Sequence, residues 1–382
     1  MKIYFDNAAT TQPHEEVIKT YAHACAQFYA NPNSAHAPGF AAEQELERHR
    51  ASILNLLGGA NHGLVFTSSG SAANTIAILG ALQGTGGKYR KKRLISSLAE
   101  HSSVLAACRY LENIGHEAVY LNMDQHGSVN LQDLENSIDE YTALVSLMYV
   151  NNETGVIFDI EAIYKTVKSA NPKAILHIDT VAGFGKHNLD IRFADVVTFA
   201  SHKIHGPKGV GALCYAMPLE PHFSAQANAE GFGGLLQQGT PDLPAVAAFA
   251  KAAELTYANI AQNSSRVAEI KQYIIDHTRA MGGVINGGCN VSPYILNISF
   301  PGIVSETLIN LLSGRGVYIS AGSSCNSRKA DKNILRHYGL GKDIIESSVR
   351  LSFSADNTMD EAAQFVQELG AALNMLKKFS KR

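Results

Sequence analysis

Through the first two thirds of the chain, short runs of apolar and β-branched residues alternate with longer stretches of helical periodicity. A run that is apolar at nearly every position indicates a strand buried on both faces, as in a parallel sheet covered by helices. Helical periodicity lies between the runs, for example at 102–114 and 160–169. Seven runs predict one large three-layer α/β unit. The predicted strands are 64–67, 93–96, 118–121, 143–148, 175–178, 196–199 and 211–215.

The pattern changes near residue 257. A long helix is predicted at 257–281 and a terminal helix at 359–379. Two helices beside a small antiparallel sheet fit this part of the chain. The elements predicted between the two helices are a strand at 294–300, a helix after Gly302, and strands near 317–320 and 349–353.

The length of the chain supports a division into two parts. Its 382 residues exceed what one hydrophobic core usually organises. We expect a large domain at 16–256 and a smaller α+β domain formed by 1–15 and 257–382.

Charge and cysteine content exclude several classes of protein. The net charge is −2, so no basic field predicts binding to nucleic acid or to a membrane surface. No run of 18 apolar residues occurs. The five cysteines are widely spaced and include no C-x-x-C pair, which argues against disulfides and against a metal site. These features indicate a cytoplasmic protein.

Polar residues follow several of the predicted strands, at the edge of the sheet where functional groups gather in open parallel sheets. Ser68-Ser-Gly-Ser71 opens a helix and is suited to bind phosphate, although a plain helix cap explains it as well. Asp179 and His101 also follow strands, and each has an ordinary structural explanation as a turn former or a buried histidine.

Lys203 gives the sharpest signal. It follows the strand at 196–199, and a rigid turn comes directly after it at Gly206-Pro207. Lysines are seldom buried unless they pair or react with another group. A lysine at the end of a core strand, beside a phosphate-binding turn and a carboxylate, is the arrangement that a covalently held cofactor needs.

Ten motifs in chain order resemble the cysteine desulfurases of the iron–sulfur-assembly type, which belong to the class V aminotransferase family of pyridoxal-phosphate (PLP) enzymes. The resemblance implies the three-layer PLP-dependent transferase fold (fold type I), with a mainly parallel seven-stranded sheet. The motifs are Tyr4-Phe-Asp-Asn-Ala-Ala-Thr-Thr11, Asn31-Pro-Asn-Ser34 with His36, Val65-Phe-Thr-Ser68, Ala99-Glu-His101, Val150-Asn-Asn-Glu-Thr-Gly155, His177-Ile-Asp179, Ser201-His-Lys203, Gly206-Pro-Lys-Gly209, Ser320-Ala-Gly-Ser-Ser-Cys325 and Ser348-Val-Arg350.

The resemblance also implies roles for individual residues. Lys203 would hold PLP covalently and serve as acid and base, Asp179 would pair with the pyridine nitrogen, and His101 would stack on the ring and move protons. Cys325 would be the nucleophile that takes sulfur from L-cysteine. Arg350 and Asn7 would bind the substrate, and Arg350 would hold the carboxylate of the substrate. The other cofactor contacts would be Asn152, Gly70, Ser71, Ser201, His202 and, toward the partner subunit of a homodimer, Thr240.

The chain departs from the family pattern at some of these contacts. Ala182 stands where the family usually has Gln, and Ala200 where it usually has a phosphate-binding Ser, with Ser201 one position later. Ser71-Ala72 replaces Thr-Glu. Each lost hydrogen bond to a charged group costs about 1–3 kcal/mol.

The expected reaction converts L-cysteine to L-alanine and leaves a persulfide on Cys325 for transfer to an acceptor protein. The small residues before Cys325 and the polar residues after it suit an accessible loop. The alternatives are a selenocysteine lyase or an aminotransferase of the same class, and a non-catalytic PLP-fold scaffold. Cys325 favours the desulfurase over the aminotransferase, because transamination has no need of a thiol. The sequence does not choose among an iron–sulfur, a tRNA-thiolation or a thiamine-pathway acceptor.

Overall fold

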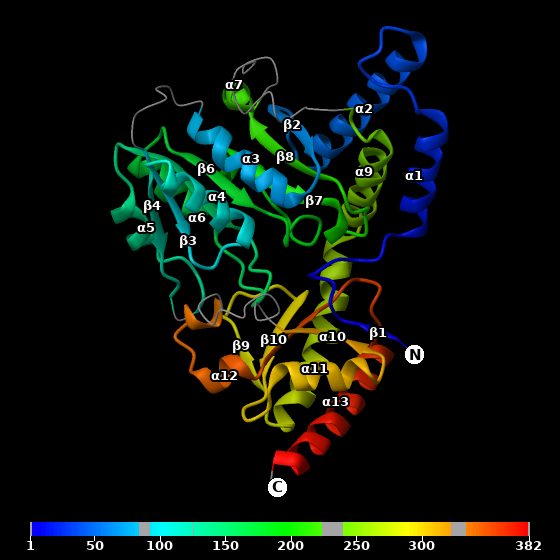
Figure 1. Cartoon of the computed structure of the whole chain (residues 1–382), viewed down its shortest axis with the longest axis vertical. Helices are drawn as coiled ribbons and strands as arrows, with labels where there is room; N and C mark the ends of the chain where they lie inside the picture. Colours follow the sequence, from blue (N-terminus) through cyan, green and yellow to red (C-terminus); the bar gives the residue numbers. More distant parts are fainter. Residues whose placement is uncertain (1, 84–91, 125, 224–239, 322–333, 381–382) are drawn as a thin grey trace.

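A seven-stranded sheet forms the centre of the larger part of the molecule (Figure 1). The computed structural model describes residues 2–83, 92–124, 126–223, 240–321 and 334–380. All seven predicted strands are confirmed, within two residues at each end. They are β2 (His62–Thr67), β3 (Arg93–Ser97), β4 (Glu117–Leu121), β5 (Thr142–Met148), β6 (Ile175–Asp179), β7 (Val196–Ala200) and β8 (Gly211–Ala216).

The strand order is β2-β8-β7-β6-β5-β3-β4. Strand β8 runs antiparallel to both of its neighbours, and every other pair is parallel. The carboxyl ends of β3, β5, β6 and β7 therefore meet at one edge of the sheet, and this edge faces the smaller part of the molecule (Figure 1).

Consecutive residues of each strand enter opposite hydrophobic clusters. Val145 joins the cluster that contains Phe249, whereas its neighbour Leu144 joins the cluster that contains Ala77 and Val104. The same alternation separates Leu64 from Val65, Ile95 from Leu94, and Leu176 from Ile175. Both faces of the sheet are buried, which explains why its strands read as continuous apolar runs. Three layers result, as predicted.

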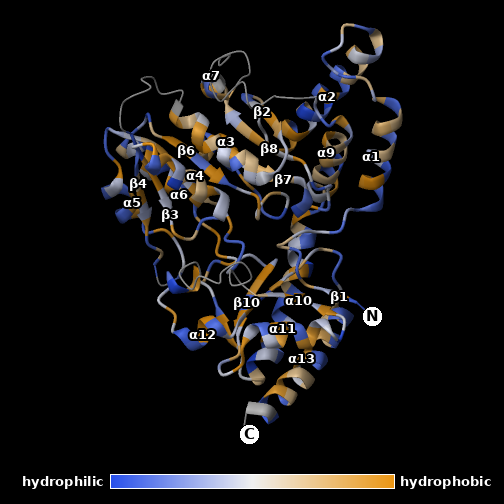
Figure 2. Ribbon diagram, in the orientation of Figure 1, coloured by the Kyte–Doolittle hydropathy of each residue, from blue (hydrophilic) through white to orange (hydrophobic). Residues whose placement is uncertain are grey.

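Helices cover the two faces, and Figure 2 shows apolar residues concentrated on the strands between them. Residues of α3 and α4 belong to one cluster, and residues of α2, α6 and α9 to the other. The helices of this part include α1 (Glu15–Gln27), α2 (Ala37–Leu56), α3 (Gly70–Gln83), α4 (Ser102–Asn113), α5 (Leu131–Ser137), α6 (Ile160–Ala170), α7 (Glu220–Phe223) and α9 (Leu243–Tyr257).

The smaller part contains a four-stranded antiparallel sheet in the order β12-β13-β10-β9. Strand β1 (Ile3–Tyr4) pairs in parallel with β11 (Val317–Tyr318) beside it. The other strands are β9 (Val284–Asn286), β10 (Ile295–Ser299), β12 (Ser320–Ala321) and β13 (Ser348–Ser352). The helices are α10 (Ile260–Ala280), α11 (Ser305–Ser313), α12 (Lys342–Glu346) and α13 (Met359–Ser380).

Three details of this part differ from the prediction. The helix expected at 257–281 starts later, because α9 ends at Tyr257 and α10 begins at Ile260. The strand expected near 317–320 is split into β11 and β12, which pair with different partners. Strand β9 was not predicted, because a strand of three residues carries too little periodicity.

One hydrophobic cluster joins the start of the chain to its last third. Phe5 is fully buried, and its ring packs edge-on against Phe353 at 5.1 Å and Phe365 at 5.5 Å between centroids. Ile3 and Ala8 lie in the same cluster as the residues of α10, α11 and α13. The packing shows that the first residues and the last third of the chain share one cluster. The domains expected at 16–256 and at 1–15 with 257–382 stay a prediction. Among the described helices, none has the length and apolar character needed to span a bilayer.

Candidate active site

Asp179 is the last residue of β6 and is buried, at 6% exposure. Its Oδ2 accepts a hydrogen bond from Asn74 Nδ2 at 2.7 Å, and its Oδ1 accepts one from the backbone N–H of Val181 at 2.9 Å. Burial raises the pKa of this carboxyl, while the Val181 N–H, His101, Asn74 and Lys203 lower it. A buried carboxylate with only these donors favours a cationic N–H as a further partner.

A chain of buried hydrogen bonds fixes the orientation of Asn74. The hydroxyl of Thr198 donates to Asn74 Oδ1, so it must accept from His177 Nε2, 3.0 Å away. Nδ1 of His177 then accepts from the hydroxyl of Ser146 at 2.8 Å. Burial lowers the pKa of His177 to about 3, which keeps the ring neutral and in this one tautomer. The Asn74 amide is thereby held with its N–H toward Asp179.

Asn74 was missed by the sequence analysis. It lies in α3, four positions after Gly70, within the apolar stretch Ala72-Ala-Asn-Thr-Ile-Ala. A polar amide that is 1% exposed among alanine and isoleucine was the signal that could have identified it, because such groups need partners.

Lys203 follows β7 in a short 3₁₀ turn and is the site's amine. Its Nζ donates to the carbonyl oxygens of Ala8 and Ala9, the latter at 2.8 Å. Burial, and then the charge of Arg350, lower the pKa of Lys203 to about 8, against the opposing effect of Asp6 and Asp179. A lysine with a pKa near neutrality has a substantial fraction of free amine, which is the nucleophilic form.

The turn after Lys203 is held in an unusual conformation. His205 has φ 64, although it is not glycine, and its N–H donates to Thr11 Oγ1 at 2.7 Å. A Cβ on Gly206 would lie 1.9 Å from Ser201 Oγ, so only glycine fits there. Thr11 also donates to the carbonyl of His202 from both its N–H and its hydroxyl. The N-terminal segment therefore fixes the turn that carries Lys203.

His101 caps the N-terminus of α4, where its Nδ1 accepts from the N–H of Ser103. The residue retains exposed surface, yet the protein around the ring lowers its pKa. Asp179 opposes this shift and Lys203 adds to it. The three predicted residues His101, Asp179 and Lys203 therefore lie within electrostatic reach of one another, as the strand order requires.

Glu100 precedes His101 and is buried beneath it. Its Oε1 accepts from Ser97 Oγ at 2.7 Å and from Met148 N at 3.2 Å, whereas its Oε2 has no partner. Burial raises the pKa of Glu100 to about 8, with Asp179 as a further cause, so the group is neutral at pH 7. A neutral Glu100 adds no negative charge beside Asp179 at this edge of the sheet.

Arg350 reaches the site from β13 in the smaller part. Its Nη2 forms an ion pair with Asp6 Oδ1 at 2.9 Å, and its Nη1 donates to the carbonyl oxygen of Asn152 at 3.0 Å. The side chain is largely buried and its Nε has no partner. Asn152 thus contacts Arg350 through its backbone. A guanidinium with an unused N–H suits a carboxylate ligand.

Asn7 and His202 have partners of their own. Asn7 is 3% exposed, and its Nδ2 donates to Ser352 O at 3.0 Å and to Tyr4 O at 3.2 Å. The ring of His202 lies 3.2 Å from Thr10 Oγ1, and burial lowers the pKa of His202 to about 4. Both residues support the N-terminal segment, and their roles toward substrate and cofactor stay predictions.

PLP fits the residues present. Ser201 Oγ is a buried hydroxyl without a partner among the described residues and lies against Gly206, while Gly70 and Ser71 open the N-terminus of α3. A helix N-terminus and a free hydroxyl are donors for a phosphate. The amine of Lys203 and the carboxylate of Asp179 are the other two groups that PLP requires.

Two of the positions that depart from the family pattern, Ala182 and Ala200, are filled by packing. Ala182 packs against the hydrophobic cluster of the smaller part, so an apolar contact stands where the family has an amide. Ala200 is fully buried, and a Cβ on Gly70 would come within 3.1 Å of it. The backbone of Gly70 therefore packs closely against Ala200, and little space remains for a larger side chain at either position.

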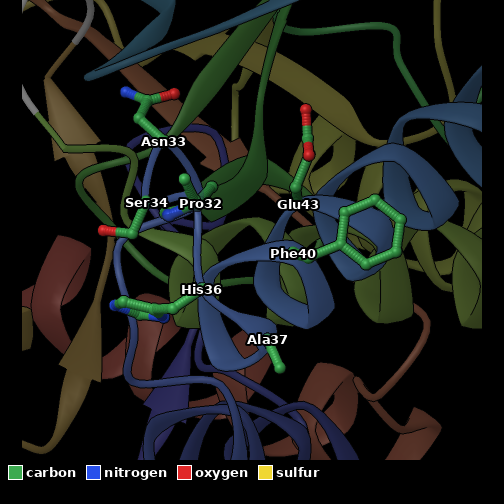
Figure 3. A pocket seen from close by; sticks show the side chains of 8 residues that line it. Pro32, Asn33, Ser34, His36, Ala37, Phe40 and Glu43 are labelled. Atoms are coloured by element: carbon green, nitrogen blue, oxygen red, sulfur yellow. The ribbon is translucent and has the colours of Figure 1, made fainter.

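One predicted site residue, Thr240, forms its hydrogen bond outside this group. Thr240 Oγ1 accepts from Asn31 Nδ2 at 3.3 Å, in the region that precedes α2. Figure 3 shows the side chains that line a pocket here: Asn33, Ser34 and His36 from the loop before α2, and Phe40 and Glu43 from α2. Cys325 lies outside the described residues.

Comparisons with known proteins agree with this geometry. The family model described as aminotransferase class-V matches residues 3–365. A NifS/IcsS protein homolog of Lactobacillus delbrueckii subsp. bulgaricus is 36% identical, over 95% of each chain. Cysteine desulfurase 2 of Trichormus variabilis is 32% identical, over 99% of this chain and 94% of its own. A solved structure named as a NifS-like protein superposes with a TM-score of 0.86 at 30% identity, over 98% of this chain and all of its own. The chain therefore belongs to the aminotransferase class-V family.

Proposed function

We propose that this protein is a PLP-dependent cysteine desulfurase that converts L-cysteine to L-alanine. The observation that carries the proposal is the partly buried amine of Lys203 at the end of β7, whose lowered pKa responds to the charges of both Arg350 and Asp179. The full-length relatives named as cysteine desulfurases support the choice of reaction. PLP, when bound, supplies an electron sink for bonds at the substrate's Cα.

The protein's own groups would handle protons and charge around that cofactor. Lys203 would hold it covalently, and its amine would then give and take a proton at the substrate's Cα. Asp179 would keep a proton on the pyridine nitrogen. The neutral ring of His101, exposed on one side, would carry protons between the site and solvent.

Arg350 would bind the substrate carboxylate. Its two terminal nitrogens already donate to Asp6 and Asn152, which orients the plane of the guanidinium before substrate arrives. The unpartnered Nε leaves an N–H for the carboxylate. Asp6 would thus act as a positioning residue for Arg350, and Asn7 as a second contact of the substrate region.

Cys325 would receive the sulfur. Its thiolate would attack the sulfur of the substrate, so that an S–S bond forms and the C–S bond breaks. The electron pair of the C–S bond stays with Cβ, which takes up a proton to give alanine, and Cys325 becomes a persulfide. Selenocysteine cleavage and transamination are the remaining alternatives within the family, and a thiol that turnover requires would distinguish desulfuration from transamination.

We further propose a cytoplasmic homodimer that passes sulfur to an acceptor protein. Large apolar side chains remain exposed on and near the first two helices: Ile18 at 56%, Tyr29 at 79% and Phe40 at 57%. They adjoin the region of Thr240, the residue expected to reach the phosphate of the partner's PLP. Covering this apolar surface with a second copy would complete the phosphate contacts.

Lys203→Ala should abolish the visible absorbance of covalently bound PLP and lower alanine production by more than about 10³-fold. Spectroscopy of the purified protein and a coupled alanine assay measure the two effects. Lys208→Ala is the matched control, because Lys208 is exposed in the same turn and should retain both signals. A variant at position 203 that remained coloured and active would refute the proposed anchor.

Cys325→Ser should retain the PLP spectrum but lose cysteine-dependent alanine and sulfide formation by at least about 10²-fold, since no nucleophile remains for the substrate sulfur. The control is Cys289→Ser, which removes an exposed free cysteine instead. Undiminished turnover in the Cys325 variant would rule out the persulfide mechanism.

The rate at which the PLP-free protein takes up PLP should rise with pH around a midpoint near 8, because uptake needs the free amine of Lys203. Arg350 lowers this pKa and Asp6 raises it. Arg350→Gln should therefore move the midpoint to higher pH, and Asp6→Asn should move it to lower pH. Stopped-flow absorbance across pH measures the midpoints, and shifts in the same direction for both variants would contradict the electrostatic account.

Ile18→Glu combined with Phe40→Glu should convert the dimer to a monomer and weaken PLP retention at the same time. Sedimentation velocity and the PLP content after dialysis are the measurements. Ile114→Glu, an equally exposed apolar position at the end of α4, is the control and should leave the dimer intact. A wild-type protein that sediments as a monomer would refute the proposed assembly.

A further inference from the structure

A small cavity lies where the N-terminal segment, the carboxyl edge of the large sheet and the smaller part of the molecule meet. Its volume is about 50 Å³, which is enough for a particle the size of a water molecule or a small ion. Among the described residues that line it there is no aspartate or glutamate. Its polar lining includes Thr11, His14, Lys186, His205, Asn263 and Ser354, with the ring of Tyr294.

Lys186 is the charged group of this cavity that lacks a partner. The residue is 8% exposed, in the turn that follows β6, and its Nζ makes no hydrogen bond or ion pair within the described part of the chain. The ring of Tyr294 lies 5.8 Å from its Nζ. Burial, and then the charges of Lys203 and Arg350, lower the pKa of Lys186 to about 7. A buried ammonium has three donors and needs a negative partner to remain charged.

Lys203, unlike Lys186, has hydrogen-bond partners for its Nζ. It also lines the cavity, but its Nζ already donates to two backbone carbonyls. Among the described residues that line the cavity, His14 and His205 contact a carboxylate. Their Nδ1 atoms lie 3.7 and 3.6 Å from Asp356 Oδ2. Asp356 is exposed and does not line the cavity.

Three neutral donors that line the same cavity also lack an acceptor among the described residues. The amide of Asn263 on α10 and the hydroxyl of Tyr294 make no hydrogen bond to described residues, and the hydroxyl of Ser354 accepts one from Asp356 N but donates none. These donors line the same cavity as the ammonium of Lys186, and the described lining holds no carboxylate, so the lining is complementary to a negative charge.

We propose that this cavity binds a small monovalent inorganic anion of the halide class, with Lys186 as its charged ligand and Asn263, Ser354 and Tyr294 as neutral ligands. A water molecule would satisfy the donors but would leave the lysine charge uncompensated. The ligands come from the loop after β6, from α10, from the residue before β10 and from the second residue after β13. A bound anion would therefore tie the large sheet to the smaller part, at a place distinct from the carboxylate site of Arg350.

The test is a titration of the PLP-bound protein with sodium bromide against sodium gluconate at constant ionic strength. The melting temperature should rise saturably by about 2 °C with bromide, because the ion binds the folded protein alone. Lys186→Met should abolish the rise. The matched control is Lys271→Met: Lys271 is also 8% exposed, but its Nζ donates to Ser292 O at 2.8 Å, so its loss should lower stability and leave the bromide response unchanged.

Asn263→Asp provides a second test that does not depend on removing a lysine. The new carboxylate would take the place of the anion, so this variant should melt at a higher temperature than the wild type in gluconate and should show no response to bromide. Anomalous diffraction from bromide-soaked crystals should place the ion in the cavity. A wild type without a bromide response, a response that persists in Lys186→Met, or bromide found elsewhere would overturn the proposal.

Discussion

The hydrogen bonds from Lys203 to the carbonyl oxygens of Ala8 and Ala9 join the start of the chain to the carboxyl end of β7, and the site depends on this junction. The same segment supplies Asp6 to Arg350 and Thr11 to the turn after Lys203. Its apolar residues are held by the core of the smaller part. One stretch of backbone therefore positions both Lys203 and Arg350 and also joins the two parts of the molecule.

The charges at this junction are balanced unevenly. Lys186, Lys203 and Arg350 converge from three elements, whereas Asp6 and Asp179 are the carboxylates that act on Lys203 among the described residues. Glu100 is neutral because of its burial. An excess of positive charge in a partly dry site favours ligands that bring phosphate or carboxylate groups, and it lowers the pKa of each lysine nearby. The site is therefore suited both to anionic ligands and to an amine that loses its proton easily.

Much of the fold could be predicted because both faces of the large sheet are buried. The seven strands appear as apolar runs, and the order of polar residues at their ends brings Asp179, Lys203 and His101 together. Strands β1 and β9 could not be predicted, because two or three residues show no period. The strand expected near 317–320 could be predicted, but not its partition between two sheets. Asn74 and the Asp6–Arg350 ion pair depend on contacts between residues 105 and 344 positions apart, which spacing along one sequence does not reveal. Lys186 was missed for the same reason, because its lack of a partner is a property of the packed molecule.

The position of the N-terminal segment also governs when the site can form during synthesis. Asn7 leaves the ribosome early, but its partner Ser352 follows 345 residues later, as do the Phe353 and Phe365 rings that bury Phe5. At about 5–20 residues per second, the first residues wait for tens of seconds before their binding surface exists. The large sheet can assemble in that interval, whereas the carbonyls that receive Lys203 gain their fixed position only once β13 and α13 have been made. A nascent chain would thus contain a folded sheet before its cofactor site has formed. The cofactor would bind only after β13 and α13 have been synthesised.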